Sequence, residues 1–481
     1  MLGRLSILAS VKKSKHCFFK VVFFSSLAYV LAFFGTVHAG PVERMAEALR
    51  FETVSFQNSE KINYQAFADF LEFIEQTYPR VFSTLSVERF SDYSLLLTWR
   101  GSQPELAPVL LDAHYDVVPI EQGTLQDWLH PPFAGVVADG YLWGRGALDD
   151  KMAVITSLEA LERLLLAGYT PERTLYFSMV HDEEIGGHQG AAVVASALHE
   201  RGVKFAYMVG EGGIVLPDNP MLSGKSMALV GLAEKTYITL HLTATGDGGH
   251  SSIPPRNNAA VSLARAVTKI HDNPLPVKLV EPVTDMLRVM GSEVGGLTGW
   301  LMRNQWLGAI PMAHQMAGDR TNNALVRSTS AVTMLDSGVK ENVVPQQAHA
   351  VVNMRLLPGE NVDEIVASIV ELINDENIVV ELDSWGQSPP VADLNGEGYA
   401  RISEAAAQVF PESLIVPGML TATTDTRHYQ LVADEVYRFR AYRVSMSDSR
   451  SIHATNERLA TDSLLRAIDF TEQLVLAIAK P

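Results

Sequence analysis

Residues 108–116 read Pro-Val-Leu-Leu-Asp-Ala-His-Tyr-Asp, an apolar run that ends in a histidine and an aspartate. The run from Pro108 to Ala113 is short and broken only by Asp112, which predicts a buried strand. His114 and Asp116 follow it two residues apart, and side chains at such positions of an extended chain point to the same side. Because an open α/β sheet carries its chemistry at the carboxyl ends of its strands, this stretch predicts such a sheet with polar groups at that edge.

Strands and helices alternate on either side of this stretch, from about Pro41 to Gly231. Strands separated by helices of ordinary length predict an α/β fold, with a mostly parallel sheet covered by helices. Gly168 stands where a helix from Met152 would end, as a C′ glycine does. Hydrophobic periodicity predicts helices over 152–167 and 190–201, and strands over 174–180 and 205–209.

The pattern changes near Glu234. Alternating apolar residues predict half-buried strands over 237–244, 330–334 and 348–356, with helical segments between them. After Pro358-Gly359 the α/β rhythm returns and ends in a helix over about 459–478. We therefore expect an inserted α+β lid or dimerisation domain over 234–357, which interrupts a catalytic domain made of residues 40–233 and 358–481.

The N-terminus has the pattern of a signal peptide over residues 1–39. Four lysines precede the apolar run 21–34, and Val37-His38-Ala39 resembles a cleavage site. This pattern predicts an exported, periplasmic or extracellular protein, while an uncleaved N-terminal membrane anchor is the alternative. Cys17 is the only cysteine and lies before the apolar run. A chain cleaved after Ala39 would therefore contain neither disulfides nor a cysteine ligand.

Size and charge restrict the class of protein. A chain of 481 residues, 47% hydrophobic and 19% charged, is typical of a globular protein of about two or three domains. The net charge is −17 and no basic stripe appears, so binding to nucleic acid through general electrostatics is excluded.

Several carboxylates follow predicted strands or precede helices. Asp149 follows a glycine-containing turn and precedes a helix, where it could bridge two ions or simply cap the helix. Glu183 and Glu184 are adjacent in the sequence. One of them could bind metal while the other transfers protons, or both could simply belong to a charged loop. Glu211 in Gly-Glu-Gly-Gly and the late His453 each have an ordinary surface role as the alternative. Together with His114 they form a ligand set suited to zinc or a similar divalent ion.

These segments give the chain a resemblance to metallopeptidase family 20, whose co-catalytic zinc enzymes include aminoacylases and carboxypeptidases. The resemblance covers about residues 51–477 and is nearest to the branch of the Gly-X carboxypeptidases and secreted N-fatty-acyl-amino-acid hydrolases. It rests on seven segments in order: HYDVVP (114–119), GRGALDDK (144–151), HDEEIGG (181–187), GHSS (249–252), VKENVVP (339–345), TDTRHY (424–429) and IHATNER (452–458).

The resemblance implies two Zn²⁺ ions per subunit, for which Co²⁺ or Mn²⁺ could substitute. It implies that His114 and Glu211 hold one ion, that Glu184 and His453 hold the other, and that Asp149 bridges them with a cis peptide bond to Asp150. Glu183 would be the general base and acid. Asp116 would accept the second ring N–H of His114 and so fix its tautomer.

The inserted domain and the C-terminal part are implied to contact the substrate. His250 would stabilise the oxyanion when the domains close, and in several relatives it comes from the partner subunit of a dimer. Asn342 and Arg355 would contact the substrate from the same domain. Arg427 would bind the free carboxylate of the amino-acid part, with a structural ion pair as the alternative.

The implied reaction is metal-dependent hydrolysis of the amide bond of peptides or N-acyl amino acids that end in a free carboxylate. An N-fatty-acyl-amino-acid amidohydrolase or synthase is the alternative, and an exported peptide-binding protein without catalysis is a distant one. The segment Met286–Met316 is rich in Leu, Met and Trp. It is either an acyl-chain groove or a packing or dimer contact within the inserted domain.

Overall fold

The computed structural model describes residues 39–384 and 386–480. Nearly all of the predicted signal peptide therefore lies outside the described residues. Among the helices that the structure does describe, none is long and apolar enough to cross a membrane.

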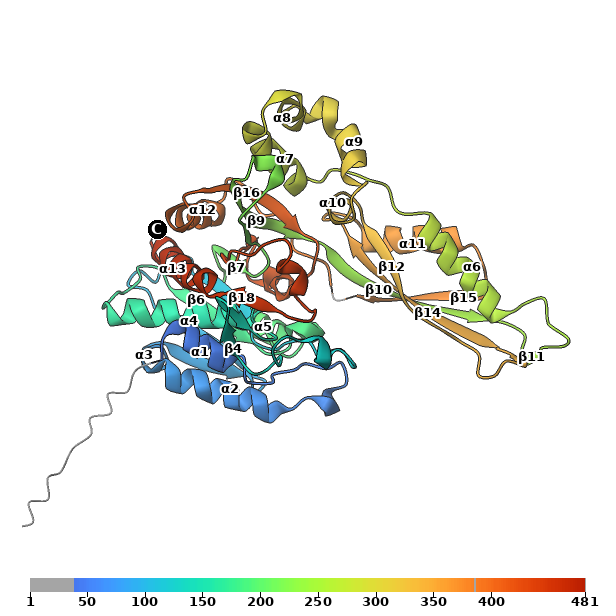
Figure 1. Cartoon of the computed structure of the whole chain (residues 1–481), viewed down its shortest axis with the longest axis horizontal. Coiled ribbons are helices and arrows are strands. Elements are labelled where there is room, and N and C mark those ends of the chain that lie inside the picture. The colour runs from blue at the N-terminus through green and yellow to red at the C-terminus, as the bar shows by residue number, and fades with distance from the viewer. Residues whose placement is uncertain (1–38, 385, 481) are drawn as a thin grey trace, which may run out of the picture. The chain divides into compact units, whose positions relative to one another are not determined.

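The fold is α/β, built on a nine-stranded mixed sheet whose central strands are mostly parallel (Figure 1). The strands, in order across the sheet, are β1 (Ser86–Phe90), β2 (Ser94–Trp99), β6 (Leu175–Val180), β3 (Val109–His114), β7 (Tyr207–Gly210), β17 (Val436–Arg438), β9 (Ser226–Glu234) and β16 (Ser413–Leu420), with β8 (Val215–Leu216) beside β9. The pairs β3–β6, β3–β7, β7–β17 and β9–β16 are parallel, while β1–β2, β2–β6, β8–β9 and β9–β17 are antiparallel.

Both faces of this sheet are covered by helices, as the near-continuous apolar runs predict. In β3, Leu110 and Leu111 are both buried but belong to different cores, because successive side chains of a strand point to opposite faces. The core that contains Leu111 also includes α1 (Pro41–Ala48), α2 (Tyr64–Thr77), α3 (Pro79–Thr84), α4 (Lys151–Leu166), α12 (Glu397–Val409) and α13 (Thr461–Ile478). The core that contains Leu110 includes α5 (Ala191–Glu200) and the short helix η5 (Asp425–Leu431).

These elements agree with the sequence patterns. The buried strand expected over 108–113 is β3, and the helix expected over 152–167 is α4, which ends before Gly168 at a positive φ of 73°. The final helix expected over 459–478 is α13. Short 3-10 helices and a three-stranded sheet complete this part: η1 (Ser59–Lys61), η2 (Leu125–Asp127), η3 (Glu183–Ile185), η4 (Pro220–Leu222), η6 (Ser449–Ser451), β4 (Val136–Ala138), β5 (Tyr141–Trp143) and β18 (Arg458–Ala460).

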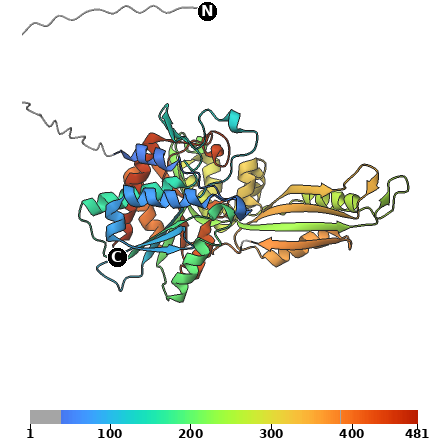
Figure 2. The ribbon, with the colours of Figure 1, turned by 90° about the horizontal axis from the view of Figure 1, so that it is seen from below.

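A separate four-stranded antiparallel sheet is formed by β12 (Thr329–Ser337), β14 (Gln347–Leu356), β10 (Thr236–Thr245) and β15 (Ile378–Ser384), in that order. Figure 2 shows these strands running alongside one another. Helices α6 (Ala259–Asp272) and α11 (Val362–Ile373) pack on it around a core of its own. The strands β11 (Gly249–His250) and β13 (Val343–Val344) pair with each other.

The expected end of the inserted domain at residue 357 is wrong. β15 pairs with β10, and Ile369 and Ile373 of α11 belong to the core of the smaller sheet. The smaller domain therefore continues to about residue 384. The local sequence patterns of α11 and β15 are compatible with either domain. Only the pairing of β15 with β10 assigns them to the smaller one.

The expected placement of Met286–Met316 within the inserted domain is also wrong. This segment forms most of α7 (Glu281–Glu293), with α8 (Gly296–Arg303) and α9 (Gln305–Met316), followed by α10 (Arg320–Val326). Met286, Met290 and Met302 pack in one core with Met227 and Met419 of the large sheet. The methionine-rich side of the segment is therefore a packing surface against β9 and β16, not a groove.

Candidate metal centre and active site

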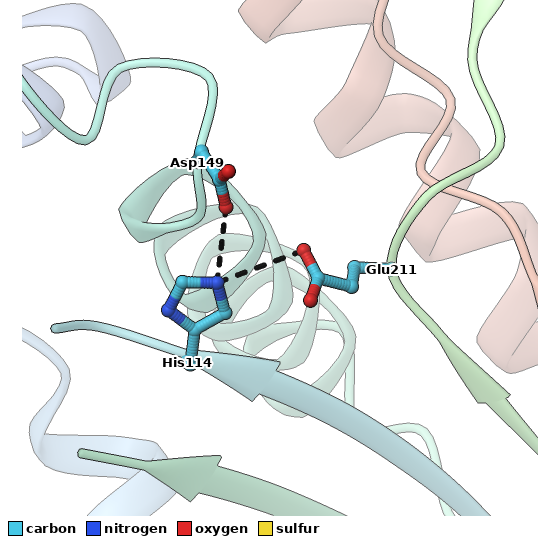
Figure 3. Close-up of side chains that lie close together, drawn as sticks. All are labelled: His114, Asp149 and Glu211. Atoms are coloured by element: carbon cyan, nitrogen blue, oxygen red, sulfur yellow. Dashed lines mark hydrogen bonds and ion pairs between the residues drawn. The ribbon is translucent and has the colours of Figure 1, made fainter. Parts of the chain in front are cut away.

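His114 is the last residue of β3 and its imidazole is buried. Its Nε2 atom lies 3.0 Å from Asp149 Oδ1 and 3.6 Å from Glu211 Oε2 (Figure 3). Asp149 precedes α4, and Glu211 follows β7, the strand beside β3. Three residues that are far apart in the sequence therefore meet at the carboxyl end of the parallel strands, as the sequence pattern predicts.

A second group uses the other oxygen of the same aspartate. His453 Nε2 lies 3.0 Å from Asp149 Oδ2 and 3.2 Å from Glu184 Oε1. The His453 side chain is about half exposed, whereas that of His114 is buried. Asp149 thus joins two groups of three ligands, which is the geometry of a carboxylate that bridges two metal ions.

The charges of this cluster fit divalent cations. An imidazole nitrogen carries one proton at most, yet each Nε2 atom faces two carboxylates. Hydrogen bonds to Asp149 and Glu184 raise the pKa of His453 to about 10 despite its partial burial. Burial raises the pKa of Glu184 to about 7. The donor set of nitrogen and oxygen atoms is one that zinc and similar ions prefer.

The loop that carries Asp149 is fixed by a buried glutamate. Glu457 accepts hydrogen bonds from the backbone N–H of Leu148 (2.8 Å) and of Asp149 (3.3 Å), and from the guanidinium of Arg145 (2.6 Å). The Asp149–Asp150 peptide bond is cis, as the resemblance implies. Glu457 therefore holds the bridging residue in place from a point four residues after His453.

Asp116 is buried and contacts both His114 and the loop that carries Glu183 and Glu184. The Nδ1 atom of His114 lies 3.1 Å from the Asp116 carbonyl oxygen and 3.3 Å from its carboxylate, so a ring N–H has an acceptor on this residue. The carboxylate also accepts from the backbone N–H of Glu183 (3.1 Å) and Glu184 (3.2 Å), and from the Ser55 hydroxyl (2.7 Å). Asp116 thus couples the orientation of His114 to the position of the two glutamates.

Glu183 begins the short helix η3 after β6, and it is buried. Burial is the main cause that raises the pKa of its carboxyl group well above the ordinary value, and the charges of Glu211 and Asp425 act in the same direction. A carboxyl group that binds protons more readily than usual is suited to taking a proton from water near neutral pH.

Arg427 lies in η5, next to the loop that carries the two glutamates. Its side chain is buried, and its guanidinium donates at 2.6 Å to the carbonyl oxygens of Thr424 and Gly186. A side chain at Gly187 would clash with the Asp425 carboxylate, so η5 and the loop after Glu183 are in close contact. Arg427 therefore stabilises, through its hydrogen bond to Gly186, the loop that carries the two glutamates.

Arg355 is the more accessible of the two arginines. It lies in β14 opposite Tyr237, with its guanidinium 4.2 Å from the centre of the Tyr237 ring. Its Nη1 atom is 3.4 Å from the Thr423 hydroxyl, which precedes η5. Burial lowers the pKa of Arg355, and the Glu183 carboxylate acts in the opposite direction. Among the two loop glutamates, it is the charge of Glu183 that acts on Arg355.

His250 and Asn342 lie at the other end of the smaller sheet. β10 starts beside Arg355 and runs for ten residues, roughly 34 Å, before the chain reaches β11. His250 is exposed in β11, and the Asn342 carbonyl accepts from Ser251 N–H there at 3.2 Å. The structure thus brings Arg355, but neither His250 nor Asn342, toward the large sheet.

Two contributors to the site escaped the sequence analysis. Ser55 and Glu457 bind no candidate ion but hold Asp116 and the Asp149 loop, respectively. The Glu457–Arg145 pair is separated by 312 residues, so no local pattern predicts it. The available signal was the place of Glu457 in the segment IHATNER (452–458), four residues after His453.

Two histidine–carboxylate groups that share one aspartate, beside a buried glutamate of raised pKa, fit the active site of a metal-dependent hydrolase. A family model described as Peptidase family M20/M25/M40 matches residues 110–477. The chain belongs to this family.

Curated relatives match over most of their length. A probable carboxypeptidase S-like 2 of Dictyostelium discoideum is 35% identical over 440 residues, which are 90% of this chain and 84% of that protein. The N-fatty-acyl-amino acid synthase/hydrolase PM20D1 of Mus musculus is 33% identical over 439 residues, 90% of this chain and 86% of that protein.

Solved structures share the fold at low identity. The M20 family metallo-carboxypeptidase Sso-CP2 of Sulfolobus solfataricus has a TM-score of 0.68 at 16% identity, with 92% of this chain and 99% of that chain covered. Human carnosine dipeptidase 1 has a TM-score of 0.65 at 16% identity, with coverages of 91% and 96%.

Proposed function

We propose that this enzyme hydrolyses the amide bond of peptides or N-acyl amino acids that end in a free carboxylate. The observation that carries the proposal is the shared Asp149, with its two oxygens directed at two histidines, beside the buried Glu183. All five ligands and the proton acceptor expected from the resemblance are present, which disfavours a binding protein without catalysis.

Two divalent cations, with Zn²⁺ as the first candidate, would be held by these ligands. His114 and Glu211 would hold one, His453 and Glu184 the other, and Asp149 both. Such ions polarise a carbonyl group and lower the pKa of water toward about 7. Three ligand carboxylates would neutralise most of the added charge, which limits the cost of burying it.

Glu183 would move the proton. Its carboxylate takes a proton from the attacking water and later delivers it to the leaving amine, which is the dual task of a general base and acid. Its raised pKa favours the first transfer. Asp116 keeps the backbone of Glu183 in position, because one carboxylate oxygen accepts its N–H.

Arg355 would bind the free carboxylate of the substrate. Its planar guanidinium suits a carboxylate, and Tyr237 supports one face of it. Arg427 would contribute by holding the Gly186 carbonyl and therefore the glutamate loop. This division of tasks replaces the carboxylate-binding role that the resemblance implied for Arg427.

His250 would stabilise the oxyanion. Its Nδ1 atom accepts from the Ser252 backbone N–H at 3.1 Å and lies 2.7 Å from the Ser252 hydroxyl. The neutral ring therefore carries its proton on Nε2, which is free to donate. Since the smaller sheet separates His250 from Arg355 of the same chain, we expect a homodimer in which His250 and Asn342 serve the partner's site.

Exposed apolar residues on the smaller sheet support this dimer. Met334 and Leu335 of the edge strand β12, together with Val343 of β13, are exposed. An unpaired edge strand with apolar side chains is a ready contact surface for a second chain.

The alternative, an N-fatty-acyl-amino-acid amidohydrolase or synthase, is supported by the PM20D1 relatives, which are named N-fatty-acyl-amino acid synthase/hydrolases. The carboxypeptidase S-like relatives support the peptidase at the same level of identity. Both substrates end in a carboxylate beside the scissile amide, so the chemistry of the site does not separate them.

The deciding experiment compares kcat/KM of zinc-loaded protein for a long-chain N-acyl-phenylalanine and for a Gly-Leu-type dipeptide. A ratio well above one identifies the acyl-amino-acid hydrolase, and a ratio well below one the carboxypeptidase. Each substrate is also tested with an amidated C-terminus, which should lower kcat/KM about 10- to 100-fold through loss of a charge-assisted bond. Absence of turnover with every substrate, at full metal occupancy, would reject the enzyme assignment.

Export through the N-terminal segment is proposed on the sequence pattern alone. N-terminal sequencing of the protein recovered outside the cytoplasm tests it. A chain that starts near Gly40 supports a cleaved signal peptide, whereas a chain that starts at Met1 in the membrane fraction supports the anchor.

A further inference from the structure

The helices α8 and α9 carry five large apolar side chains on their outer sides. We call this set the α8–α9 apolar face, and its members are Leu297, Trp300, Trp306, Leu307 and Ile310, all exposed. Trp306 is 80% exposed, Ile310 74% and Leu297 73%. Side chains three or four positions apart share one side of a helix, so Leu297 lies beside Trp300 and Trp306 beside Ile310.

The opposite sides of these helices are already used for packing. Gly299 and Met302 of α8, and Gly308 and Ala313 of α9, are buried. A helix that packs on one side normally presents polar residues on the other. The exposed tryptophan and isoleucine side chains therefore indicate a contact with an apolar partner outside the described chain.

The charges on α8 and α9 restrict the kind of partner that could cover the α8–α9 apolar face. No Asp or Glu occurs between Glu293 and Asp319, although the chain has a net charge of −17. Arg303 and His314 are exposed on the same two helices. A second copy packed symmetrically against this face would bring these basic groups together without a carboxylate from α8 or α9, whereas lipid phosphates would complement them.

Helix length and residue type point the same way. α8 has 8 residues and α9 has 12, both too short to span a bilayer. Tryptophan is favoured at the boundary between lipid and water, because its ring is apolar and its N–H is polar. Short helices with aromatic and aliphatic residues on one side and basic groups beside them lie in the plane of the interface.

From these observations we infer that the α8–α9 apolar face binds reversibly to the surface of a phospholipid bilayer. The helices lie in the interface, Trp306 and Ile310 enter the acyl region, and Arg303 and His314 stay at the level of the phosphates. This inference is independent of the proposed reaction, because none of these residues belongs to the candidate active site.

The test places a polarity-sensitive fluorophore on the face in the full-length chain. Because Cys17 is the only cysteine, Cys17→Ala with Ile310→Cys gives a single labelling site, and Cys17→Ala with Leu166→Cys gives a matched control that is 67% exposed on α4. Vesicles of phosphatidylcholine with a minor share of phosphatidylglycerol are added. We expect the label at 310 to brighten and to be quenched by acyl-chain spin labels, with no response at 166.

Any other pattern overturns the inference. No response at 310, or an equal response at both positions, would mean that the face does not enter the bilayer, even if the N-terminal segment tethers the protein. A response at 310 that follows protein concentration without vesicles would assign the face to a second copy.

A pair of charge variants gives an independent measure. Trp306→Glu with Ile310→Glu should weaken vesicle binding at least about tenfold relative to Leu166→Glu with Leu465→Glu. Both variants should keep the wild-type kcat/KM for a soluble dipeptide, which shows that they are folded. Equal vesicle binding by the two variants would reject the bilayer contact.

Discussion

The carboxyl end of the large sheet and the far end of the smaller sheet hold candidate residues in opposite ways. At the large sheet, His114, Asp116 and Glu183 are buried and linked by hydrogen bonds that converge from several segments. At the smaller sheet, His250 and Asn342 are exposed, and their hydrogen bonds run only within and between the two paired loops that carry them. The proposed function places the first region within one chain and requires that the second be brought to it by a partner subunit.

This difference separates two requirements of the proposed reaction. Metal ligands and a proton acceptor need fixed geometry, which a buried network provides. Groups that enclose the substrate must let it enter, and exposed positions on a separate sheet allow that. Variants in the two regions should therefore fail differently.

The largest expected effect is that of Glu183→Gln in the fixed region. Removing the proton acceptor should lower kcat about 10²- to 10⁴-fold while both metal ions remain bound, because Glu183 is not among the ligands. Metal content by elemental analysis and steady-state kinetics measure the two quantities. Retained activity would show that another group takes the proton.

His250→Ala tests the separate region. Loss of one oxyanion donor should lower kcat about 10²- to 10³-fold. If His250 serves the partner's site, mixed dimers of His250→Ala and Glu183→Gln chains contain one intact site. Co-refolding the two inactive variants should then restore roughly a quarter of the wild-type activity. No recovery, with dimers present, would place His250 and Glu183 of one chain in the same site.

Arg355→Lys and Arg427→Lys form a matched pair, with Arg355 in the smaller sheet and Arg427 in η5 beside the large sheet. Arg355→Lys should raise KM about 10- to 100-fold for substrates with a free carboxylate, and much less for amidated ones. Arg427→Lys should lower kcat and leave the preference for the carboxylate intact, because a lysine cannot span the Thr424 and Gly186 carbonyls. The reverse assignment of these effects would restore Arg427 as the carboxylate-binding residue.

The smallest effect concerns the pH dependence of metal binding. Without a cation, the pKa of His453 is raised to about 10, so its ring is protonated at neutral pH. Binding requires the neutral ring, and each displaced proton makes affinity rise about tenfold per pH unit. Affinity should therefore increase with pH up to about 10, more steeply below about 7, where Glu184 also binds a proton. Titration with a metal indicator at several pH values measures the slope, and a flat profile would contradict it.

The sequence predicted the elements of the large sheet well. β3, β6, α4, α5 and α13 occur within a few residues of the ranges that their periodicity indicated. The five expected metal ligands form the two groups of the structure. His114, Glu184 and Glu211 end or follow strands of the large sheet and Asp149 precedes α4, whereas His453 lies in a loop between η6 and β18.

Other features were beyond local patterns. α11 and β15 have the same local pattern as any helix and strand of an α/β protein, and only the pairing of β15 with β10 assigns them to the smaller sheet. The Met286–Met316 segment is apolar on most sides, so periodicity could not show which side packs and which is exposed. The buried Arg427 guanidinium donates to the carbonyls of Thr424 and Gly186, and its residue type alone does not predict these contacts.

The sequence alone determined the fold class, the family resemblance and the ligand types, because these depend on periodicity and on short motifs at the ends of elements. Tertiary structure decided which oxygen of Asp149 faces which histidine, that Glu457 holds the Asp149 loop, and which arginine stays accessible. Those outcomes depend on contacts between residues hundreds of positions apart, and no local preference encodes such contacts.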